Sequence, residues 1–243
     1  MPLGFLNEGL IGLQLIEREL LLFAAFWFIV SAVDELVVDL GWLWLRLTGK
    51  ARDFRLKQGE ATEPLRKKTA VFVPAWQESS VVGHTIGHML HAWPQRELML
   101  YVGCYRNDPE TISAAMAAAA GAGDGRVRVV VHDRDGPTTK ADCLNRLYRA
   151  LAADEQRRGA NVANIVLHDA EDMVHPAALA VIDRALDGND FVQLPVRPEP
   201  HAGSRWIAWH YADEFAEAHA KTLVVRDAVG AAIPAAGVGC GFS

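Results

Sequence analysis

The chain has 243 residues, of which 51% are hydrophobic, and its formal net charge is −6 at pH 7 with a pI of about 5.8. This length and apolar content suffice for one sizeable core, so we expect a single domain with an appendage. The acidic balance and the lack of a basic stripe argue against a nucleic-acid-binding protein. Three widely spaced cysteines fit reduced thiols in a reducing compartment better than a disulfide framework or a zinc site: Cys104, Cys143 and Cys240.

The N-terminal region is the most apolar part of the chain. Residues 20–33 include no charged side chain, and apolar character resumes after three acids and continues to Leu47. As a helix, residues 20–47 would extend over roughly 40 Å, enough to cross a bilayer. Because acids are costly inside lipid, the three must lie near one membrane face or against a partner helix: Asp34, Glu35 and Asp39. We expect residues 1–49 to form a transmembrane segment, and a buried or interfacial helix is the alternative.

Basic residues follow this segment directly, and residues 50–68 have the polar composition of a linker. The basic group comprises Arg46, Lys50, Arg52, Arg55 and Lys57. Because loops rich in Lys and Arg stay on the cytoplasmic side of a membrane, we expect everything downstream to be cytoplasmic. A cleaved signal peptide fits poorly, since no basic region precedes the apolar run.

From residue 69 onward, short β-branched runs alternate with helical patterns. The expected strands cover residues 69–73, 98–105, 126–132, 163–168 and 190–196. The expected helices begin after caps at Ser79 or Ser80, at Asp108 and at Thr138 or Thr139, and two more cover residues 176–186 and 206–225. This alternation predicts an α/β fold with a mostly parallel sheet and helices on both faces. In such sheets, ligands bind beyond the carboxyl ends of the strands.

Three acids directly follow the fourth expected strand: Asp169, Glu171 and Asp172. Divalent cations of the magnesium type take oxygen ligands, typically one or two carboxylates together with substrate phosphates. An Asp-x-acid spacing lets two carboxylates converge on one ion where the chain turns. Acids are also favoured at a helix N-terminus by the helix dipole, which is the structural alternative.

Two other segments lie where ligands are expected. Residues 74–78 (PAWQE) close the first strand, and residues 138–145 (TTKADCLN) open the helix after the third strand. Lys140, near that helix N-terminus, could meet a phosphate together with backbone N–H groups, although a solvated surface lysine is the alternative. Three histidines at helical spacing lack the adjacent glutamate of a zincin helix, so we interpret them as a polar helix face: His84, His88 and His91.

Five segments in this order and spacing resemble glycosyltransferase family 2, and more narrowly its membrane-bound branch called bacteriophage adsorption protein B. They are PAWQE, NDPET (107–111), TTKADCLN, HDAED (168–172) and GVGCGFS (237–243). The resemblance covers residues 68–243 and implies a nucleotide-diphosphosugar transferase fold of the GT-A type over residues 69–243. It also implies a nucleotide-diphosphosugar donor, a glycan or lipid acceptor, and a bacterial inner-membrane location with the catalytic domain in the cytoplasm.

The same resemblance assigns roles to individual residues. Asp169 and Glu171 match the family's metal-binding Asp-x-Asp and would hold Mg²⁺ or Mn²⁺. The expected nucleoside, phosphate and sugar contacts are Pro74, Ala75, Glu78, Asp108, Lys140, Asn145 and Gly239, the last within a glycine-rich loop that also contains Gly237 and Gly241.

The chain departs from the family pattern in two places. Gly103 and Cys104 stand where many relatives carry acids at the end of the second strand, which puts the identity of the nucleotide base in doubt. A carboxylate general base would lie in a Thr-Glu-Asp-like motif beyond the glycine-rich loop, and the sequence ends at Ser243 before such a motif. We therefore expect a C-terminally incomplete fragment of a longer protein, and the catalytic base is unassigned.

The leading hypothesis is an inverting glycosyltransferase that moves a sugar from a metal-bound nucleotide sugar to an acceptor at the cytoplasmic face of the inner membrane. The alternative, motivated by the missing base, is a membrane-anchored nucleotide-binding or assembly module without turnover. Nucleotidyl transfer on a related sheet would require a glycine-rich loop with Arg or Lys after the first strand, and PAWQESS does not provide one.

Overall fold

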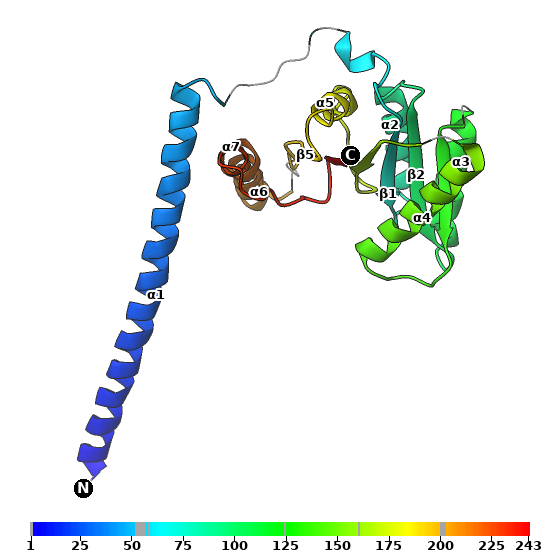
Figure 1. Ribbon diagram of the computed structural model, residues 1–243. Helices are drawn as coiled ribbons and strands as arrows, with labels where there is room; N and C mark the ends of the chain where they lie inside the picture. The colour runs from blue at the N-terminus through cyan, green and yellow to red at the C-terminus, as the bar shows by residue number, and fades with distance from the viewer. Residues whose placement is uncertain (1, 52–56, 58, 124, 160, 200–202) are drawn as a thin grey trace. The chain divides into compact units, whose positions relative to one another are not determined.

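The computed structural model describes most of the chain, in two compact units (Figure 1). The described residues are 2–51, 57, 59–123, 125–159, 161–199 and 203–243, with side chains from residue 11 onward except that of residue 205. One unit comprises Met1–Asp53 with Asp213–Ala232, and the other comprises Phe54–Ala212 with Ile233–Ser243. Part of the expected linker, including Arg52 and Arg55, lies outside the described residues.

The first unit is built on a long apolar helix, α1 (Pro2–Leu47). It begins well before residue 20, where the uncharged run begins, although residues 2–12 include one proline and three glycines. By length and composition, Ile11–Leu47 could cross a membrane: the mean hydropathy of an 18-residue window reaches 2.1, and no residue of that window is buried.

Residues of a π-helical turn and of the helix after it pack on the C-terminal part of α1. The expected helix 206–225 is interrupted, and consists of α6 (Arg205–Glu217), a π-helical turn η2 (Ala218–Thr222) and α7 (Leu223–Ala228). Lys221 on the π-turn donates to Asp39 at 2.5 Å, and the Trp42 indole donates to the Ala220 carbonyl at 3.1 Å. Asp39, one of the three acids that follow the uncharged run, therefore has a cationic partner in the same chain.

The second unit contains a six-stranded sheet in the order β3-β2-β1-β4-β6-β5. The strands are β1 (Thr69–Pro74), β2 (Leu98–Tyr105), β3 (Val127–His132), β4 (Asn164–Leu167), β5 (Phe191–Gln193) and β6 (Cys240–Phe242). The helices are η1 (Glu60–Thr62), α2 (Val82–Ala92), α3 (Pro109–Ala122), α4 (Lys140–Arg158) and α5 (Ala178–Ala185). β1 pairs in parallel with β2 and β4, and β2 with β3, so the carboxyl ends of these four strands share one edge.

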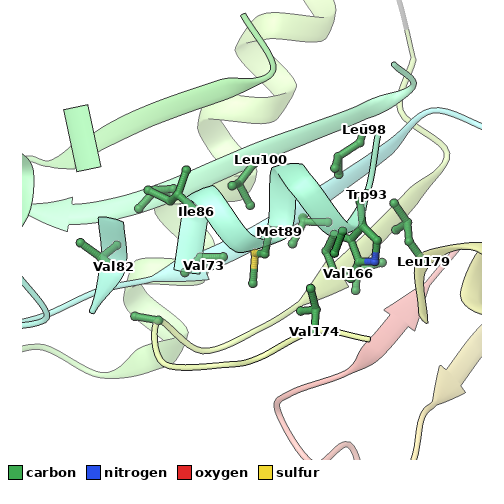
Figure 2. Packing of buried hydrophobic residues seen from close by; sticks show 14 of the residues in the cluster. Val73, Val82, Ile86, Met89, Trp93, Leu98, Leu100, Val166, Val174 and Leu179 are labelled. Carbon is green, nitrogen blue, oxygen red and sulfur yellow. The ribbon is translucent and has the colours of Figure 1, made fainter. Parts of the chain in front are cut away.

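Both faces of the sheet are covered, as the continuous apolar strands predict. Alternate residues of β1 point to opposite faces because side chains alternate along a strand. Val71 and Val73 pack with α2, α3 and α5 in the larger core, and Figure 2 shows the α2 side of this packing. Ala70 and Phe72 face the second core, which α4 covers with Leu147.

Three local expectations are wrong. α2 begins after Val81, which offers no side-chain cap, so neither Ser79 nor Ser80 caps it. The glycine-rich segment is not entirely a loop, because residues 240–242 form β6, antiparallel to both β4 and β5. The fifth strand is shorter than expected, at three residues.

Candidate functional site

The acids of the sequence motifs meet at the carboxyl edge of the sheet. β1 lies between β2 and β4, so the segments that leave these strands are neighbours. Asp169 and Glu171 follow β4, Glu78 follows β1, and Asp108 follows β2. Burial raises the pKa of Glu78, and the charges of Glu171, Asp169 and Asp108 raise it further, in that order. The three acids therefore lie close enough to Glu78 to disfavour its charged form, and a nearby cation would relieve this repulsion.

A tight turn presents Asp169 and Glu171. The Asp172 carboxylate accepts from the Asp169 backbone N–H at 2.9 Å and lies 2.8 Å from Nδ1 of His168. Asp172 thus stabilises the turn through its own hydrogen bonds. The Asp169 side chain, in contrast, is about one-third exposed, and Glu171 is exposed. Among the residues that the structure describes, Glu171 has no hydrogen-bond partner, so its carboxylate is available to a ligand.

Lys140 brings a positive charge to the same place. It is the first residue of α4, whose N-cap Thr139 accepts from the Asp142 N–H. Its ammonium contacts Asp169 and donates to the Gly237 carbonyl at 3.0 Å. Asn145 lies five positions later, about 140° around the helix axis, and is exposed without a hydrogen bond to any described residue. The structure therefore brings Lys140 to the acids but not Asn145.

Residues at the N-terminal end of α3 hold the PAWQE segment in place through hydrogen bonds. Asp108 caps α3 by accepting from Thr111 N, and it also accepts from the Gln77 N–H at 2.7 Å. The Glu78 N–H donates to Thr111 Oγ1 at 3.0 Å. Pro74 ends β1 beside β2, and Ala75 is buried in the larger core. Asp108 is buried, and both of its carboxylate oxygens accept hydrogen bonds, so it orders this loop. Thr111 also holds the loop, although only its place in NDPET pointed to it in the sequence.

The two departures at the end of β2 have a packing explanation. A Cβ atom added to Gly103 would lie 2.6 Å from Cys143 Sγ of α4, so no acid fits there. Cys104 is fully buried, and burial raises the pKa of its thiol to about 12. Neither position can offer a charged group to a nucleobase.

The glycine-rich segment is tied to neighbouring strands. Gly239, with φ of 61°, donates from its N–H to the Leu167 carbonyl at 2.9 Å and accepts from the Leu194 N–H at 2.9 Å. Gln193 also holds this segment in place, because its side chain donates to the Val238 carbonyl and accepts from the Ala236 N–H. No motif singled out Gln193 in the sequence.

The oxygen donors fit a hard divalent ion such as Mg²⁺ or Mn²⁺. Asp169 and Glu171 supply two carboxylates beside Glu78, whose pKa their charges raise. Across the described ranges, no group of three His, Cys, Asp or Glu side chains forms a ready-made metal cage. Magnesium-type ions usually take one or two carboxylates and complete their shell with substrate phosphates and water, so the donor set fits an ion that arrives with a phosphate-bearing substrate.

Comparisons with known proteins identify a family and two related proteins. Residues 66–243 match the family described as Glycosyltransferase like family 2. The chain is 34% identical over 219 residues to Bacteriophage adsorption protein B of Escherichia coli (strain K12), which covers 88% of this chain and 29% of that protein. Bacteriophage N4 adsorption protein B of Escherichia coli O157:H7 matches with the same identity and coverage. The chain thus spans less than a third of the length of these relatives.

The fold also resembles a solved structure. This is a mannosyltransferase from Pyrobaculum calidifontis in complex with GDP-Man and Mn²⁺, with a TM-score of 0.50 and 18% sequence identity. The match covers 74% of this chain and 48% of that one. At this identity the likeness concerns the arrangement of strands and helices.

Proposed function

The chain belongs to glycosyltransferase family 2, and from this we propose that it transfers a glycosyl group from a nucleotide-diphosphosugar to an acceptor at the cytoplasmic face of a membrane. The observation that carries the proposal is the convergence of Asp169, Glu171 and Glu78 beside Lys140, at the edge of a parallel sheet where ligands bind. The structural relative bound to GDP-Man and Mn²⁺ is consistent with this class of donor and cofactor.

In this proposal, each side chain acts on the diphosphate or its ion. Asp169 and Glu171 hold Mg²⁺ or Mn²⁺, which when bound neutralises negative charge on the departing nucleoside diphosphate. Lys140 stands at a helix N-terminus, where backbone N–H groups and the helix dipole also favour a phosphate. Residues 74–78, ordered through Asp108, line the nucleoside.

The acceptor side involves the glycine-rich segment. Lys140, the proposed phosphate contact, donates to the Gly237 carbonyl, and Gln193 donates to the Val238 carbonyl. A phosphate bound at Lys140 would therefore also affect the position of Gly239. We expect inversion at the anomeric carbon, and proton NMR of the first-formed product reports its configuration.

Asp169→Asn tests the assignment directly. The amide keeps the size of the side chain but removes its charge, so Mn²⁺-dependent binding of nucleoside diphosphates should be lost while the circular dichroism spectrum is unchanged. Asp187→Asn is the matched control, since Asp187 pairs with Arg66 and Lys67 away from the site and its loss should leave binding intact. An unchanged calorimetric affinity in Asp169→Asn would refute the metal assignment.

A further inference from the structure

The segment between β4 and α5 carries the two metal-site acids without regular secondary structure. Residues 168–175 form one turn and an extended stretch. Such a segment has peptide groups that no helix or sheet ladder satisfies, so its conformation depends on bonds from elsewhere. Figure 2 shows its residue Val174 beside α2, whose core stripe includes Ile86 and Met89.

The side of α2 next to this core stripe donates hydrogen bonds to the segment. Thr85 Oγ1 donates to the Ala170 carbonyl at 2.6 Å, and Thr85 is only 4% exposed. Three residues later, Nε2 of His88 lies 2.9 Å from the Val174 carbonyl, so this nitrogen carries the proton. At the end of the helix, the Trp93 indole donates to the His175 carbonyl at 3.2 Å. Three carbonyls of one irregular segment are therefore fixed by one helix.

The same segment is held internally by Asp172. Its carboxylate binds the Asp169 N–H and Nδ1 of the buried His168. Bonds from α2 and from Asp172 together fix the backbone on both sides of Ala170. The side chains of Asp169 and Glu171 are the ones left to face Glu78 and Lys140.

We propose that Thr85 and His88 are positioning residues for the divalent cation, because their bonds to the Ala170 and Val174 carbonyls set the angle at which Asp169 and Glu171 present their carboxylates. This inference rests on the function proposed above. Metal sites need their ligands held within about 0.5 Å, and groups that orient the ligands typically change metal affinity 10–100-fold when removed. His88 was expected only to form a polar helix face, and the partner of Thr85 lies 85 residues away in sequence.

The test compares Thr85→Val with Thr85→Ser in the full chain. Valine keeps the volume and branching of threonine but removes the donor, whereas serine keeps the donor. Binding of Mn²⁺ is measured by electron paramagnetic resonance of the free ion, in the presence of inorganic pyrophosphate. We expect Thr85→Val to weaken Mn²⁺ binding roughly 10-fold or more and Thr85→Ser to restore most of it. Ser113→Ala, which removes another hydroxyl-to-carbonyl bond on α3, should leave Mn²⁺ binding unchanged.

The outcomes separate this inference from the proposed function. If Thr85→Val lowers the melting temperature but binds Mn²⁺ as the wild type does, the hydrogen bond is only structural and the inference fails. If Asp169→Asn also leaves Mn²⁺ binding unchanged, the metal site itself is wrong, and a wild-type chain that binds no Mn²⁺ overturns both. Should Thr85→Val not fold, His88→Leu and His88→Gln provide the same comparison, because glutamine can replace the Nε2 donor.

Discussion

Lys140 is the residue at which the charges of the site are balanced. Its ammonium contacts Asp169, the same carboxylate that we assign to the divalent ion, and it also donates to the Gly237 carbonyl. Both side chains are more than 30% exposed, so the ion pair itself adds little stability. A divalent ion must compete with this ammonium, whereas a phosphate gains from it.

Lys140→Met should therefore change the affinity for two ligands in opposite directions. Without the competing ammonium, Mn²⁺ alone should bind several-fold more tightly, because Asp169 becomes fully available. Affinity for inorganic pyrophosphate in the absence of metal should fall, since a phosphate contact is lost. Calorimetric titration with each ligand measures both effects, and Lys68→Met, at the start of the sheet, is the control. Weaker binding of both ligands would show that Lys140 does not compete with the ion.

Glu78 makes stability depend on pH in a direction opposite to that of most carboxylates. Burial and neighbouring acids raise its pKa in the folded chain, so the folded state binds a proton at pH values where the unfolded chain has released it. The contribution of Glu78 to the free energy of unfolding is fully present below its pKa in the unfolded chain. It is lost as the pH rises through the raised pKa of the folded chain. With a chelator present, Glu78→Gln should melt higher than wild type at pH 7, and the difference should shrink towards pH 4. Glu110→Gln, an exposed change on α3, should show no such trend in the same thermal scans.

At the scale of elements, the sequence predicts what depends on local chemistry. Asp108 was predicted as a cap, and so was Thr138 or Thr139, because a cap is recognised from the residue and the apolar pattern that follows it. In the structure, Asp108 and Thr139 bind the backbone of the first helical turn. The start of α2 could not be predicted in this way, because its N-cap residue is Val81, which has no capping side chain. Its start is set by the packing of Val82 and Ile86 on the sheet. The α/β class with a mostly parallel sheet is confirmed, including its likeness to a GT-A enzyme.

The parts that could not be predicted depend on partners distant in sequence. β6 has only three residues, Cys-Gly-Phe, too few to give a strand pattern in the sequence, and it forms where β4 and β5 pair with it. Gly241 is required there, since a Cβ atom would lie 2.5 Å from a methyl carbon of Ile182. The roles of Asp169, Glu171 and Asn145 stay predictions, and for Asn145 the motif match does not fix which face of the helix the residue occupies.

The two caps differ in how much structure depends on them, which gives a prediction for α3 and α4. Thr139→Ala removes one cap bond and should lower the free energy of unfolding by about 1 kcal/mol. Asp108→Ala removes a cap and also leaves the Gln77 N–H without its acceptor, so its cost should be larger, about 2–3 kcal/mol. Urea denaturation of the two variants measures both values, and equal costs would contradict the bracing role of Asp108.

For the whole molecule, the long helix α1 bears on where the proposed reaction would take place. Its 37-residue apolar part would extend over about 55 Å, which exceeds the roughly 30 Å hydrocarbon core of a bilayer. The uncharged run 20–33 covers only about 21 Å of that core, so charged residues at one or both ends of the run would lie at its edges. Among the acids that follow the run, Asp39 is already paired with Lys221. The basic residues after α1 favour a cytoplasmic position for the rest of the chain, although Arg52 and Arg55 are not among the described residues.

Cysteine labelling tests this orientation with little background. The native thiols are buried, at 0%, 2% and 0% exposure for Cys104, Cys143 and Cys240, so a membrane-impermeant maleimide should not react with the wild-type chain. Gln156 is exposed near the C-terminal end of α4, at the opposite end of this helix from Lys140, and Gln156→Cys adds one accessible thiol. Expressed in Escherichia coli, this variant should be labelled in inside-out inner-membrane vesicles but not in intact spheroplasts. Labelling in intact spheroplasts would place the sheet outside the cytoplasm, where nucleotide sugars are not supplied, and the proposed reaction could not occur there.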